Sequence, residues 1–157
     1  MKKLLLLAIA ACIPSMAQEY VAYYTFTLAG SAGIFTIQQP AANAKTVRFS
    51  EVYVSCSASC TITMERDGSA ASTTAITPTK LRATYNNATA TVFIDSNVGA
   101  GTVIQPGVFI NASGGESWTV FDLKSLSLIG NGTGKNVTIK TNSITATVRI
   151  SVKWSEQ

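Results

Sequence analysis

The end of the chain alternates strictly between apolar and polar residues. From Ile144 to Trp154 every second residue is apolar, and threonine, serine, arginine and lysine fill the positions between. Because successive side chains of a strand point to opposite faces of a sheet, this pattern predicts a β-strand with one buried and one wet face. At about 3.3 Å per residue it would span roughly 36 Å, about twice the commonest strand length. We expect such a strand to lie centrally in a sheet or to bend across two packed sheets.

The segment at residues 19–28 is apolar or aromatic on both faces. A strand of this kind is normally covered on both sides. We expect its own core on one side and a loop or another subunit on the other.

The rest of the chain consists of short strand-like segments separated by turn residues. We expect these strands at residues 34–38, 46–56, 61–65, 88–95, 102–105, 108–111, 117–123, 126–129 and 137–141. The apolar positions change parity between Phe49 and Val52, which predicts a β-bulge near Ser50-Glu51. We expect 61–65 to return antiparallel to 46–56, and 137–141 to pair with the terminal strand across Asn142-Ser143.

No segment of the mature chain has a helical period, so the pattern predicts an all-β fold, a single-domain β-sandwich. A jelly roll is the preferred topology, with the first and last strands side by side in one sheet. An immunoglobulin-like sandwich is the alternative, although the chain lacks the Cys…Trp…Cys spacing of true immunoglobulin domains.

The opening of the chain predicts export. Lys2 and Lys3 precede an apolar run at residues 4–13, and Ser15-Met16-Ala17 supplies the small residues of a cleavage site. We expect a secretory signal at residues 1–17, a mature domain at 18–157, and a secreted or cell-surface location, with the periplasm as an alternative. The apolar run is shorter than the ~20 residues of a membrane span, so no stable membrane insertion is expected after cleavage. Lipoprotein processing at Cys12 is the alternative.

Two cysteines remain in the mature chain, Cys56 and Cys60, on either side of Ser57-Ala58-Ser59. This spacing and the expected oxidising compartment predict a structural disulfide that pins the tip of a hairpin. The closed loop is small, so the chain-entropy model assigns it only roughly 2 kcal/mol.

Composition argues against catalysis. The chain has 12 basic and 8 acidic residues and no histidine, and its charges are scattered singly. We therefore expect no enzyme, no cofactor, no metal site and no nucleic-acid partner. Thr-x-Thr pairs recur without a fixed period, which gives little support to an ice-binding surface.

Aromatic residues are the remaining candidates for a ligand site. The tyrosines and tryptophans are Tyr20, Tyr23, Tyr24, Tyr53, Tyr85, Trp118 and Trp154. Most fall in predicted strands, where core packing is the default role. Tyr85 lies in an irregular segment, so we expect it to be surface-exposed. Tyr85 and Trp118 are the candidates for stacking on a sugar ring.

Several segments resemble small β-rich, jelly-roll-like surface proteins of bacteria and bacterial viruses. They are Val52-Tyr53-Val54-Ser55-Cys56 with Cys60-Thr61, Arg66-Asp67-Gly68, residues 96–102 and residues 130–154. The resemblance implies a virion-surface or cell-surface β-sandwich, with a trimer as one assembly, and it supplies no functional residues.

These observations together predict a secreted, non-enzymatic structural or adhesive surface module that self-associates into a homo-oligomer. A carbohydrate-binding module with a glycan or cell-surface partner is the first alternative. A pilin of the donor-strand type is the second, although the Cys56–Cys60 spacing is too short for the disulfide of that family.

Overall fold

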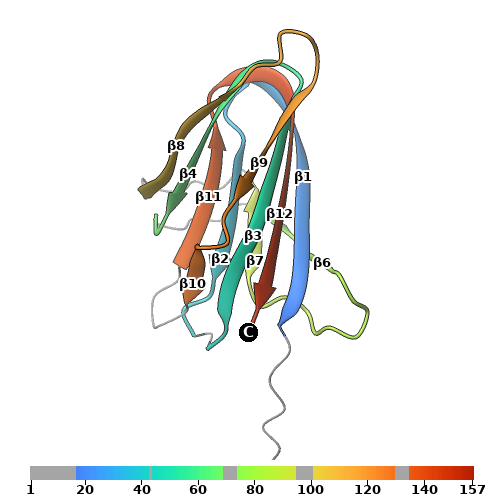
Figure 1. The fold of residues 1–157 in the computed structure, drawn as a ribbon, viewed down its shortest axis with the longest axis vertical. Coiled ribbons are helices and arrows are strands. Elements are labelled where there is room, and N and C mark those ends of the chain that lie inside the picture. The colour runs from blue at the N-terminus through green and yellow to red at the C-terminus, as the bar shows by residue number, and fades with distance from the viewer. Residues whose placement is uncertain (1–16, 43, 69–73, 95–100, 130–134) are drawn as a thin grey trace, which may run out of the picture.

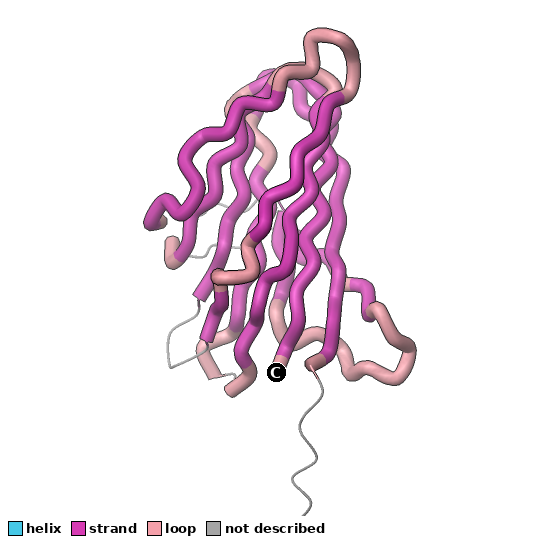
Figure 2. The backbone as a smooth tube through the Cα atoms, viewed as in Figure 1, coloured by secondary structure: helices cyan, strands magenta, loops and turns pink. Residues whose placement is uncertain are grey.

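The computed structural model describes residues 17–42, 44–68, 74–94, 101–129 and 135–157. Two antiparallel β-sheets pack face to face, which confirms the predicted β-sandwich (Figures 1 and 2). The predicted signal up to Met16, with Cys12, lies outside the described residues. So do Asp95 and the parts of the resembling segments at 96–100 and 130–134.

The first sheet contains the two ends of the chain. Its order is β6 (Thr79–Lys80), β1 (Gln18–Ser31), β12 (Ile144–Glu156) and β3 (Thr46–Cys56), and β3 also pairs with β9 (Ser117–Asp122) and β10 (Ser127–Ile129). The second sheet has the order β5 (Thr74–Ile76), β7 (Thr91–Ile94), β2 (Ile34–Gln39), β11 (Lys135–Thr141), β4 (Cys60–Arg66) and β8 (Thr102–Ile110).

The long terminal strand is the centre of the first sheet, as its length predicts. β12 lies between β1 and β3, so the first and last strands are side by side (Figure 1). The expected bulge is also present, because Lys153 is opposite Glu51 while the next residue, Trp154, is opposite Phe49. Ser50 is the extra residue, and its hydroxyl donates to the Lys153 carbonyl at 3.0 Å.

The strand pairing is nested along the chain. β1 pairs with β12, β2 with β11, β3 with β9, and β4 with β8. Each pair therefore joins an early strand to a late one, and the innermost pair is closest in sequence.

The core lies between the two sheets and is filled by the inward positions of both. Its largest fully buried apolar side chains are Trp154, Tyr20, Phe35, Ile37, Ile62, Met64, Ile139 and Ile150. Tyr20 is opposite Trp154 in the β1–β12 ladder, and their rings stack with centroids 5.9 Å apart. The alternation read from the sequence thus decides which face of β12 is buried, whereas β1, apolar on both faces in sequence, buries one face and leaves Tyr23 exposed on the other.

Both predicted hairpins are wrong. β3 belongs to the first sheet and β4 to the second, and β11 and β12 are likewise in different sheets. The predicted Cys56–Cys60 disulfide is present, with Cα atoms 6.5 Å apart, but it joins the two sheets where the chain crosses between them. Two strands of alternating apolar and polar residues joined by a short connection can form a hairpin in one sheet or lie in two packed sheets. In both arrangements each strand turns its apolar face to the core, so the pattern does not distinguish them.

The predicted strands at 102–105 and 108–111 form the single strand β8. Pro106 does not interrupt the interior of a sheet, because β8 is an edge strand, where proline is tolerated. The register between β8 and β4 shifts near Met64. The strand expected at 88–95 is shorter and begins at Thr91. The backbone N–H groups of Thr89 and Ala90 donate hydrogen bonds to the Glu156 carboxylate instead of to a neighbouring strand.

The second sheet contains an ion pair whose contribution should depend on pH. Burial by itself would raise the pKa of Glu65, but hydrogen bonds from Lys140 Nζ (2.8 Å) and Gly101 N (3.1 Å), and the Lys140 charge, bring it below its ordinary value of 4.5. A lowered native pKa adds stability above the unfolded value, and this stability is lost as the pH falls through the native value.

We therefore expect Glu65→Gln to cost about 1–2 kcal/mol at neutral pH and progressively less as the pH falls below about 4.5. Urea unfolding midpoints of wild type and variant across this range measure the gap, with the exposed Glu51→Gln as the control. A gap that stays constant into acid would contradict the role of the ionised Glu65.

Candidate functional site

The outer face of the first sheet carries a row of exposed apolar side chains. Tyr53 on β3 is opposite Val120 on β9 and Ser151 on β12, and Ser151 is in turn opposite Tyr23 on β1. Tyr23 is 69% exposed and Val120 48%, and Trp118, two residues before Val120 on the same face of β9, is 64% exposed. We call Tyr23, Tyr53, Trp118 and Val120 the aromatic face. It crosses four neighbouring strands, which are adjacent in Figure 1.

Two rings of the aromatic face stack on each other. The Tyr53 and Trp118 centroids are 5.9 Å apart with an angle of 25° between the planes. Trp118 is opposite Ser55, so the two rings are diagonal neighbours across strands β3 and β9. Such diagonal contacts are within reach of aromatic side chains and hold them in place.

A polar cluster borders the rings. Ser55, between Trp118 and Arg149 in the sheet, donates from its hydroxyl to Glu116 Oε1 at 2.7 Å, and Arg149 Nη1 pairs with the same oxygen. The hydrogen bond from Arg149, and then that from Ser55, hold the pKa of Glu116 below its ordinary value. Glu116 in turn raises the pKa of Arg149. The cluster therefore stays ionised at neutral pH.

Charges on and beside this face balance. Three ion pairs lie there: Arg149–Glu116, Lys153–Glu19 at 3.7 Å and Lys124–Asp122 at 3.1 Å. Exposed Arg48 and Glu51, on the outward side of β3, add one charge of each sign. The face therefore has no net charge from these side chains.

The two predicted sugar-stacking residues do not form one site. Trp118 lies on the outer face, as an exposed aromatic ring should. Tyr85 is only half-buried rather than freely exposed, because its ring packs 6.3 Å from the buried Tyr20 ring and Arg82 lies 5.8 Å from its centroid. Tyr20 faces the core, so Tyr85 extends the core cluster at the edge of the sandwich.

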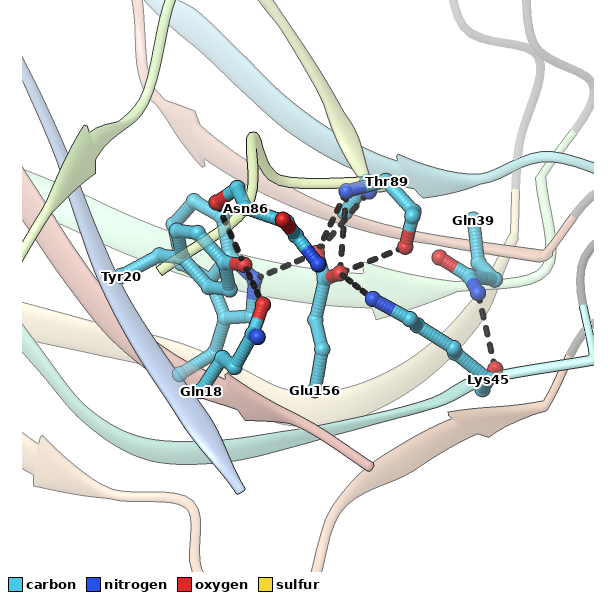
Figure 3. A network of polar contacts seen from close by, with 9 residues as sticks. Gln18, Tyr20, Gln39, Lys45, Asn86, Thr89 and Glu156 are labelled. Atoms are coloured by element: carbon cyan, nitrogen blue, oxygen red, sulfur yellow. Dashed lines mark hydrogen bonds and ion pairs between the residues drawn. The ribbon is translucent and has the colours of Figure 1, made fainter. Parts of the chain in front are cut away.

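The buried carboxylate of Glu156 organises a network of polar contacts with Thr89 and Lys45 (Figure 3). Glu156, 1% exposed, accepts hydrogen bonds from Thr89 N (3.0 and 2.9 Å), Thr89 Oγ1 (2.6 Å) and Ala90 N (3.0 Å). Trp154 Nε1 lies 3.3 Å from Oε1, and Lys45 Nζ is 3.8 Å from Oε2. Burial of this charge is therefore offset by several donors, as a buried ion requires.

No specific role was predicted for Glu156 from the sequence, so this one was missed. The signal was present, because extending the alternation of the terminal strand by two residues puts Glu156 on the same face as Trp154. That face is buried to the end of β12.

The Tyr20 hydroxyl connects β1 to the same region. It lies 2.7 Å from Gln18 Oε1 and 3.0 Å from the Asn86 carbonyl oxygen (Figure 3). Burial raises the pKa of Tyr20, and the charge of Glu156 and the neighbouring Tyr85 raise it further. The phenol therefore stays protonated and can donate.

Among the described residues, no three or more acids, cysteines or histidines cluster as metal ligands would. In the same part of the chain, no helix has the length and apolar character to cross a membrane. No protein-family model, curated protein or solved structure matches the sequence or the fold.

Proposed function

We propose that the chain is an exported, non-enzymatic structural or adhesive surface module that associates with further copies of itself through the aromatic face. The observation that carries this proposal is the exposure of Tyr23, Tyr53, Val120 and Trp118 on one face of the first sheet, with Ser151 of β12 between Tyr23 and Tyr53. Exposed apolar and aromatic groups gathered on one face of a sheet are typical of an interaction surface.

The size of the face favours a protein partner. The strands β1, β12, β3 and β9 have 14, 13, 11 and 6 residues. With strands about 4.8 Å apart and about 3.3 Å per residue, their outer side covers roughly 700 Å². This area is close to the about 800 Å² that each partner buries in a stable interface. Tyrosine and tryptophan are also the residues most enriched among the anchors of such interfaces.

The charge balance favours a second copy as that partner. A symmetric interface places the same patch against itself, so an uncompensated charge would repel its own copy. Here the ion pairs of Arg149, Lys153 and Lys124 neutralise the acids beside the aromatic rings within one chain. The doubly apolar pattern of β1 fits the same interpretation, because Tyr23 is the outward residue that a partner would cover.

We also propose the jelly-roll topology. The nested pairing of first with last strand, through to β4 with β8, is what results when one long hairpin of eight strands is wrapped into two sheets. β5, β6 and β7 would then be additions at the sheet edges. The immunoglobulin-like alternative does not account for this nesting.

The test of self-association replaces the rings and measures the solution mass. We expect the purified protein to form a defined oligomer in light scattering behind a sizing column, and Tyr23→Ser with Trp118→Ser to shift it to the monomer. Phe109→Ser is the matched control, since Phe109 is 64% exposed but lies on β8 of the second sheet. An oligomer that both variants leave unchanged would place the interface elsewhere.

Carbohydrate binding is the second candidate, because the stacked Trp118 and Tyr53 rings lie beside the Arg149–Glu116 pair. Rings with adjacent polar groups are suited to a sugar's C–H face and hydroxyls. Two results together would favour this function over self-association: the wild-type protein is a monomer, and it binds a sugar on a glycan array with an affinity that Trp118→Ser abolishes.

A further inference from the structure

We infer that the hollow formed by the segment 77–88 is a binding site for a small acidic sugar. The hollow has a volume of about 480 Å³, within the range of roughly 300–1,000 Å³ for small-molecule sites. It lies at the β6 edge of the first sheet, next to β1, and none of its lining residues belongs to the aromatic face. Its lining residues are Thr77, Pro78, Thr79, Lys80, Ala83, Asn87 and Ala88.

The chemistry of the lining residues is complementary to that of an acidic sugar. Lys80 supplies a cation for a carboxylate, and Thr77, Thr79 and Asn87 supply hydroxyl and amide groups that pair with ring hydroxyls. Proline and alanine form the apolar remainder, against which the C–H face of a sugar ring can pack.

The cation of this hollow is not neutralised from within the described residues. None of the described residues that line the hollow is an acid, and none of the ion pairs between described residues includes Lys80, which is exposed. A lysine among hydroxyl and amide groups therefore selects a ligand with a negative charge over its neutral counterpart.

Both walls of the hollow are held by the sandwich. On one side Thr79 and Lys80 pair with β1, and Leu81 N donates to the Glu19 carbonyl at 3.1 Å. On the other side the Tyr20 hydroxyl holds the Asn86 carbonyl (Figure 3).

Just beyond that second wall, the buried Glu156 carboxylate binds the N–H groups of Thr89 and Ala90 (Figure 3). This carboxylate thus fixes the end of the segment that closes the hollow. A site whose walls are fixed in advance loses less conformational entropy on binding.

The test titrates the purified protein with glucuronate and, as its neutral counterpart, glucose, and follows backbone amide shifts by NMR. We expect saturable shifts confined to residues around the hollow, with a dissociation constant for glucuronate on the order of 1 mM and binding of glucose at least about tenfold weaker. Galacturonate and N-acetylneuraminate, against galactose, extend the comparison to other acidic sugars.

Two variants test the assignment. Lys80→Met should weaken glucuronate binding at least about tenfold and abolish its advantage over glucose, and Ala83→Phe should fill the hollow and block both sugars. Lys135→Met is the control, because Lys135 lies on β11 of the second sheet, outside both proposed sites, and should leave the affinity unchanged.

Three results would overturn the inference: no saturable shift with any of the three acids at about 10 mM, equal affinity for glucose and glucuronate, or unchanged binding in Lys80→Met. The double variant Tyr23→Ser with Trp118→Ser should keep glucuronate binding. The experiment therefore distinguishes a failure of the proposed sugar site from a failure of the proposed self-association.

Discussion

Trp154→Ala is expected to lower the free energy of unfolding by about 3–5 kcal/mol, the range for removing a large aromatic side chain from a packed core. Trp154 is 1% exposed, and its ring stacks on Tyr20 between the two sheets. The substitution removes that stacking and leaves a cavity that strands held in two ladders cannot collapse to fill. For a domain with about 5–15 kcal/mol of total stability, this is a large fraction.

Urea unfolding followed by tyrosine and tryptophan fluorescence measures this loss. Trp118→Ala makes the same chemical change at an exposed position and is expected to stay within about 0.5 kcal/mol of wild type. Equal losses in the two variants would show that Trp154 is not the core residue that its burial implies. Measurement at low protein concentration keeps self-association from contributing to the Trp118 value.

Glu156→Ala is expected to cost a similar amount, about 3–5 kcal/mol, for an electrostatic reason. Its carboxylate is the acceptor for the N–H groups of Thr89 and Ala90, and Ala90 is buried. Without the carboxylate these donors lose their partner in a site closed to solvent, and each unsatisfied buried group costs about 1–3 kcal/mol. Glu156→Gln keeps one acceptor oxygen, so its loss should be smaller.

Hydrogen exchange separates this local effect from general destabilisation. The amides of Thr89 and Ala90 should exchange much faster in Glu156→Ala, while those of β12 and β3 change only with global stability. Glu51→Ala removes an exposed carboxylate from the same sheet and serves as the control. If Glu156→Ala were no more destabilising than Glu51→Ala, the carboxylate would not anchor the segment at 89–90.

The residues of the proposed interface were foreseen only in part. Trp118 was predicted as a candidate for stacking on a sugar ring, and it is 64% exposed on the outer face of the first sheet. Tyr53, Val120 and Tyr23 join it only because β9, β3, β12 and β1 are neighbours in one sheet, and strand order is not encoded in alternation. Tyr85 is less exposed than predicted because its ring packs against that of Tyr20, a residue distant in sequence.

The sequence by itself determined most of the strands and, where apolar and polar residues alternate, which face of the strand is buried. The strict alternation of residues 144–154, the apolar and aromatic segment at 19–28 and the change of parity at Ser50 all reappear in β12, β1 and the bulge of β3. These features follow from the period of two of a strand and from the cost of exposing apolar surface, which are local properties.

Only the tertiary structure decided which strands pair and what the polar residues at the edges do. Cys56–Cys60 and Asn142-Ser143 both lie where a short connection can turn back within a sheet or cross to the other one, and here the chain crosses. Likewise, Glu156 is buried because Thr89 and Ala90, from far along the chain, bring their N–H groups to it. Long-range partners set these outcomes, since the free energy of a pairing or a buried charge depends on groups that the local pattern does not contain.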